Sequence, residues 1–78
     1  MPGRFYANVA IDPDRAGRDV GRIAEEVLQY LTTLPRADVK LTLEIDARAP
    51  DGVPDDVQRI VIENCQTLRF AKQGFESD

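Results

Sequence analysis

The stretch Val39–Asp46 constrains the fold more than any other part of the chain. Its aliphatic residues alternate strictly with polar residues, so one side of the stretch is apolar and the other polar. This period of two is typical of a β-strand with one buried and one solvated face. Leu43 lies in the middle of the apolar side, and we expect it in the hydrophobic core.

Two further segments show strand patterns at the two ends of the chain. Phe5–Ile11 alternates in the same way and predicts a first strand, which Asp12-Pro13 ends. Leu68–Lys72 predicts a short final strand with Leu68 and Phe70 directed inward.

Between these segments the apolar spacing becomes helical. The first stripe consists of Val20, Ile23, Ala24, Val27, Leu28 and Leu31. This helix begins either at Asp12-Pro13, as a cap followed by a first helical residue, or near Arg18, since Gly17 intervenes. A second helix begins at Pro54, and its stripe consists of Val57, Ile60, Val61, Asn64 and Cys65.

The order of these elements, β-α-β-α-β, predicts an α/β fold. Because each strand has one apolar face, both helices should cover the same face of a three-stranded sheet, as a two-layer open-faced sandwich. The strand order is then 1-2-3; the alternative places the last strand beside the first, antiparallel, which makes the fold α+β. A chain of 78 residues is long enough for one small domain spanning 1–78.

The uncovered face of this sheet is the first candidate interaction surface. Parallel sheets are normally covered on both faces, so the bare face is either merely solvated or covered by another molecule. The candidate residues are Tyr6, Asn8, Lys40, Thr42, Glu44 and Arg69.

The composition excludes several chemistries. The chain has no histidine, which removes Ser-His-Asp and Cys-His catalysis and most zinc sites. Cys65 is the single cysteine, so no internal disulfide forms, and we expect a reducing, cytoplasmic setting. No phosphate-cradling glycine motif and no membrane-spanning stretch occur. We therefore expect no catalytic residue, metal or cofactor in this segment.

A polar run at the start of the first helix is the second candidate site. Arg18 and Arg22 could clamp an anion there, because helix N-termini favour negative charge. The alternative is a charged helix face, with Arg22 paired to Glu26 at i,i+4 spacing and nearby aspartates repelling an anion.

The chain resembles the C-terminal segment of a family of large prokaryotic predicted AAA+ ATPases, a domain of unknown function with ATP binding. The resemblance covers about Phe5 to Glu76. It lies in Asp12-Pro13, Gly17-Arg18-Asp19, Arg22-Ile23-Ala24-Glu25-Glu26-Val27, Leu43-Glu44-Ile45 and Glu63-Asn64-Cys65 with Leu68. It implies the C-terminal domain of an ATPase in a restriction or phage-defence system, with ATP bound by the parent protein upstream.

Two function classes are consistent with these features. The first is a non-catalytic accessory domain that docks onto its parent ATPase or a partner subunit. The second is a small module that binds single-stranded nucleic acid on the open sheet face, with Tyr6 as a stacking platform beside Lys40 and Arg69. The net charge of −4 disfavours the second class, and we expect no membrane partner.

Overall fold

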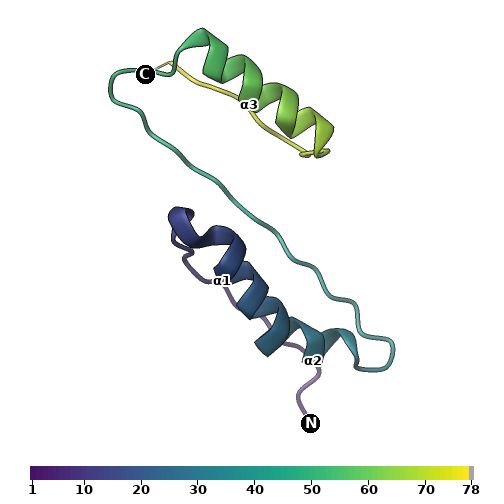
Figure 1. Cartoon of the computed structure of the whole chain (residues 1–78). Coiled ribbons are helices and arrows are strands. Elements are labelled where there is room, and N and C mark those ends of the chain that lie inside the picture. The colour runs from purple at the N-terminus through teal and green to yellow at the C-terminus, as the bar shows by residue number, and fades with distance from the viewer. Residues whose placement is uncertain (78) are drawn as a thin grey trace. The chain divides into compact units, whose positions relative to one another are not determined.

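The computed structural model describes residues 1–77, which divide into two compact units, Met1–Leu43 and residues 44–77. Each unit combines one amphipathic helix with extended chain (Figure 1). No helix among the described residues is long and apolar enough to cross a membrane.

The helix of the first unit runs through four consecutive elements. A 3-10 turn, η1 (Pro13–Arg15), leads into α1 (Ala16–Ile23), a π-helical stretch η2 (Ala24–Leu28) and α2 (Gln29–Thr32). The Asp12 carboxylate accepts a hydrogen bond of 3.0 Å from the Asp14 amide and caps the start. The helical region therefore begins with a 3-10 turn at Asp12-Pro13, the earlier predicted start, and the regular α-helix begins at Ala16, between that start and Arg18.

A turn that contains Pro35 ends this helix. The Ala37 amide donates to the Leu34 carbonyl at 3.2 Å, and Arg36 has a positive φ of 59°. Proline followed by a residue of positive φ is typical of a type II turn, in which glycine normally occupies the Arg36 position.

The second unit contains α3 (Asp55–Thr67), which begins one residue after the predicted start. At its end the Phe70 amide donates to the Cys65 carbonyl at 2.9 Å, and the Arg69 amide donates to the Gln66 carbonyl at 3.1 Å. This pair of bonds is the Schellman motif, and Arg69 takes its left-handed position with φ of 62°. Cys65 is buried, at 9% exposure, which confirms its predicted place in the stripe of this helix.

The predicted α/β sandwich is wrong, because the described residues contain two helical regions and no β-strand. Phe5–Ile11 and Val39–Asp46 lie outside the helices and make no backbone–backbone hydrogen bond within the described chain, whereas a strand requires a paired neighbour. The predicted strand Leu68–Lys72 fails for a different reason. Its second residue, Arg69, takes a left-handed conformation that belongs to the helix end.

The predicted position of Leu43 in the core is also wrong, since its side chain is 64% exposed. The neighbouring apolar residues Leu41 and Ile45 are 64% and 69% exposed. Without a sheet to carry them, the alternating residues have no second layer against which to pack. Cys65 is the single hydrophobic residue that the described chain buries.

Candidate functional site

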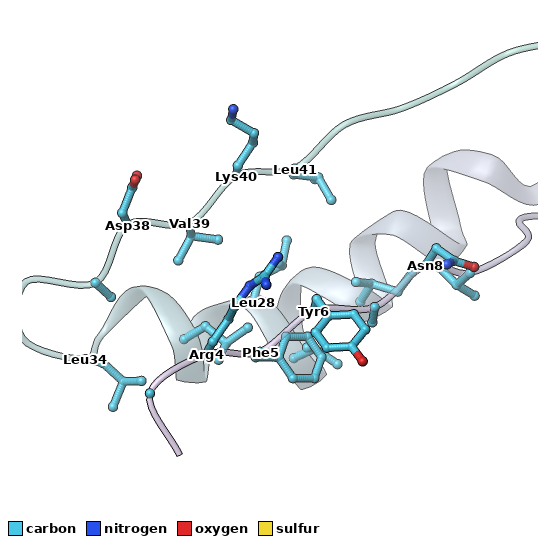
Figure 2. A pocket seen from close by; sticks show the side chains of 17 residues that line it. Arg4, Phe5, Tyr6, Asn8, Leu28, Leu34, Asp38, Val39, Lys40 and Leu41 are labelled. Carbon is cyan, nitrogen blue, oxygen red and sulfur yellow. The ribbon is translucent and has the colours of Figure 1, made fainter. Parts of the chain in front are cut away.

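The first unit contains a groove of about 690 Å³ between its helix and its two extended segments. The helix contributes an apolar floor, consisting of Ile23, Val27, Leu28 and Leu31, and Leu34 in the turn that follows extends it. Residues 3–9 form one wall and residues 37–41 form the other. In Figure 2 the segment that carries Asp38 to Leu41 runs above the helix, and the segment that carries Arg4 to Asn8 runs along the helix.

The second wall keeps the two-sided pattern that the sequence predicts. Val39 and Leu41 point toward the helix, whereas Asp38 and Lys40 point away from it (Figure 2). Residues 39–41 therefore place their side chains as a strand would. The alternation correctly predicted the direction of these side chains, although the strand itself is absent.

The backbone of both walls is open to a partner. Residues 3–9 and 38–48 make no backbone–backbone hydrogen bond in the described part of the chain. Each non-proline residue of these segments carries one donor and one acceptor that need water or another polypeptide. An apolar floor between two such walls is the arrangement that an exposed sheet edge offers to an added strand.

Charged side chains are spread along the walls of the groove. The guanidinium of Arg4 lies over the ring of Tyr6, with 5.4 Å between its central carbon and the ring centroid. This cation–π contact covers one face of the ring. Lys40 lies on the opposite wall with Asp38 as its near neighbour in sequence.

The structure divides the predicted interaction face between the two units. Tyr6, Asn8 and Lys40 line the groove, and Thr42 comes next but one after Lys40 on the same extended segment. The two remaining candidates, Glu44 and Arg69, belong to the second unit. The groove of the first unit therefore contains only part of the predicted interaction face.

The predicted anion site lies on α1, away from the groove lining. The Arg22 Nε atom is 3.6 Å from the Glu26 carboxylate, which confirms the i,i+4 pair predicted as the alternative. Arg18 lies one turn earlier on the same helix. At the helix start the Asp12 carboxylate already accepts an amide hydrogen bond, so this end carries its own negative group.

The described residues hold no cluster of side chains that could bind a metal ion. The groove itself was not predicted from the sequence, because the apolar sides of the predicted strands and helices were expected to pack on each other in a two-layer sandwich. The alternation of residues 5–11 and 39–46 was the available signal, since it gives each segment one apolar side that needs a surface to cover it.

Comparisons with protein-family models, with curated proteins and with solved structures found no match to this chain. Functional inference therefore rests on the groove and on the exposure of the surrounding side chains.

Proposed function

We propose that this chain is a non-catalytic interaction module whose apolar faces are covered by another polypeptide. One observation carries the proposal: the apolar residues Leu41, Leu43 and Ile45 are at least 64% exposed, on a segment whose backbone is unpaired. Full burial of such a side chain contributes about 1.5–3 kcal/mol, so covering all three would offset part of the cost of associating with a partner.

The groove favours a polypeptide over a small molecule as the binding partner. Its walls offer backbone donors and acceptors along whole segments, and its floor is a helical stripe of aliphatic side chains. An added strand uses both features, because its backbone pairs with a wall and its alternate side chains meet the floor.

The resemblance to predicted AAA+ ATPases supplies a candidate partner. Under this proposal the chain is an accessory domain in the cytoplasm that docks onto its parent ATPase or an associated subunit of a restriction or phage-defence system. The chain itself holds no nucleotide, and its purified form should not hydrolyse ATP. Turnover that disappears on replacing Arg18 or Arg22 would contradict this assignment.

Dye binding and thermal unfolding test the interaction module directly. At low micromolar concentration the purified chain should bind the hydrophobic dye ANS and melt without a sharp cooperative transition, because its apolar faces lack their partner. A monomer that binds no dye and melts cooperatively covers its own apolar faces, and this result would contradict the proposal.

A titration with a single-stranded oligonucleotide tests the alternative that the chain binds nucleic acid. The Arg4 guanidinium over the Tyr6 ring competes with base stacking on that face, and the net charge of −4 repels phosphates. We expect no binding at low salt. Salt-sensitive micromolar binding that Tyr6→Ala weakens would replace the protein-interaction proposal.

A further inference from the structure

The extended segment that begins at the groove wall of residues 37–41 and continues to Arg48 is complementary to itself in sequence. Consider two copies of residues 38–48 running antiparallel, with Leu43 of one copy opposite Leu43 of the other. Asp38 then lies opposite Arg48, and Lys40 lies opposite Asp46. In the same register Leu41 lies opposite Ile45, and Val39 lies opposite Ala47. Both charge–charge pairs are attractive, and the remaining polar pair, Thr42–Glu44, places a hydroxyl opposite a carboxylate.

Neighbouring registers lose this match. A shift that centres the pair on Thr42 keeps one attractive pair, Lys40 opposite Glu44, and places Asp38 opposite Asp46. A shift the other way, centred on Glu44, places Glu44 opposite itself and Lys40 opposite Arg48. Registers between these place apolar residues opposite polar ones and turn one apolar side toward water. Like charges directly opposite destabilise a strand pair, so the Leu43-centred register is selected.

The structure leaves this segment free for such pairing. Residues 38–48 make no backbone–backbone hydrogen bond in the described chain, and the inward side chains Val39 and Leu41 line the groove. An added strand on this wall would place its own apolar residues above the helical stripe, beside Val39 and Leu41. Its charged side chains would face outward, as Asp38 and Lys40 do in Figure 2.

We propose that a second copy of this chain occupies the groove, and that the two copies pair antiparallel through residues 38–48 about a two-fold axis at Leu43. The proposal rests on the proposed function, because it names the polypeptide that covers the apolar face. A two-fold axis makes the contact isologous, so each Lys40–Asp46 and Asp38–Arg48 pair occurs twice.

Charge reversal tests the register in solution by sedimentation over a range of concentrations. Lys40→Glu places a carboxylate opposite Asp46, and Asp46→Lys places an ammonium group opposite Lys40. Each variant should weaken self-association about tenfold or more, since the repulsion occurs at two symmetric positions. Lys72→Glu is the matched control for Lys40→Glu, because it changes the net charge equally outside the paired segment and should associate like the natural chain.

Mixing the two variants is the decisive experiment. In a heterodimer of Lys40→Glu with Asp46→Lys, the first chain carries carboxylates at positions 40 and 46 and the second carries ammonium groups at both. In the Leu43-centred register both cross-chain contacts therefore join one carboxylate to one ammonium group. An equimolar mixture should therefore associate more strongly than either variant alone, and the double variant should recover association on its own. Single variants that associate normally, or a double variant that stays monomeric, would overturn the proposal.

A cysteine cross-link tests the axis independently. In a Cys65→Ser background, Leu43→Cys should form a disulfide-linked dimer on mild oxidation. Opposite residues lie about 4.5–5.5 Å apart between Cα atoms, inside the range of about 4.4–6.8 Å that disulfides span. Leu41→Cys should not cross-link, because its two copies lie four positions apart, about 13 Å along the strands. Equal cross-linking of both variants would contradict the register.

These outcomes separate the two proposals. If the natural chain stays monomeric at all concentrations yet binds ANS, the proposal that a second copy is the partner is contradicted. The proposal that the chain is an interaction module then still stands. If the chain is monomeric and binds no dye, both proposals are contradicted.

Discussion

The two units end their helices in a similar way and differ in the chain beyond the helix end. Arg36 in the first unit and Arg69 in the second both adopt a positive φ, 59° and 62°, where the chain leaves its helix. After Arg69 the chain is tied to α3 by the Schellman bonds from Phe70 and Arg69. After Arg36 the turn closes on Leu34, and the chain continues as the unpaired wall of the groove.

The two units also differ in how many of their backbone donors and acceptors stay free beside an apolar surface. In the second unit backbone bonds seal the helix end, and the Gln58 side chain donates to the Val53 carbonyl at 2.7 Å near the other end. There the chain buries Cys65. In the first unit two extended segments keep their donors and acceptors free beside an apolar floor. The first unit therefore holds the groove, and the unpaired segment proposed to bind a second copy continues from it through residues 44–48 of the second unit.

The largest effect should come from proline in the helix of the first unit. Gly21→Pro removes a backbone donor and clashes with the preceding turn, which costs about 3 kcal/mol of helix stability. Circular dichroism should lose helical signal, and NMR secondary shifts should vanish over residues 16–32. Gly21→Ala is the control: a Cβ at Gly21 meets nothing within 4 Å, so alanine should stabilise the helix by about 1 kcal/mol. A helix that survives proline would refute the described helix.

A smaller effect should result from loss of the cap that distinguishes the two helix starts. The Asp12 carboxylate accepts from the Asp14 amide at 3.0 Å, whereas Pro54 before α3 provides no side-chain cap. Asp12→Ala should therefore cost about 1 kcal/mol, and Asp12→Asn should retain most of this stability. Amide exchange of residues 14–18 reports the change. Equal exchange in both variants would show that the cap contributes nothing.

The end of α3 should become more stable when its left-handed residue is glycine. Arg69 takes a conformation that costs a non-glycine residue about 1–2 kcal/mol. Arg69→Gly should slow amide exchange at Phe70 and raise the stability of α3 by about 1 kcal/mol, whereas Arg69→Val should lower it. If valine is tolerated as well as glycine, the Schellman geometry is wrong.

The smallest effect belongs to the Arg22–Glu26 pair. Its side chains are 62% and 66% exposed and 3.6 Å apart, so water and salt screen the attraction. Glu26→Gln should lower helix stability by about 0.3 kcal/mol, and the loss should shrink at high salt. A salt-independent loss above about 1 kcal/mol would mean that Glu26 has another role.

The sequence predicted the local features that depend on neighbours along the chain. The stripe from Val20 to Leu31 forms one helix, and a second helix carries Cys65 at its buried position. The Arg22–Glu26 pair forms as i,i+4 spacing predicts. Val39 and Leu41 share one side, as alternation requires. All these features are fixed within a few residues.

The sequence failed to predict features that need a distant partner. Alternation in residues 39–46 predicts which side chains share a face, and it leaves the paired strand unspecified. Leu43 was therefore assigned to a core that the described chain does not form. The predicted interaction face does not form as one sheet surface, because the strands that would carry it have no paired neighbours. Tyr6, Asn8 and Lys40 still line the groove, because both of its walls lie beside one helix.

Amide hydrogen exchange on a dilute sample of the Lys40→Glu variant decides whether the walls of the groove lack a partner within the chain, since this variant should be monomeric. We predict protection in α1 and α3 and none in residues 3–9 and 38–48, whose backbone groups have no partner within the described chain. Protection of these two segments in the monomer, unchanged on dilution, would show that the chain pairs them internally and that its groove is not open to a second polypeptide.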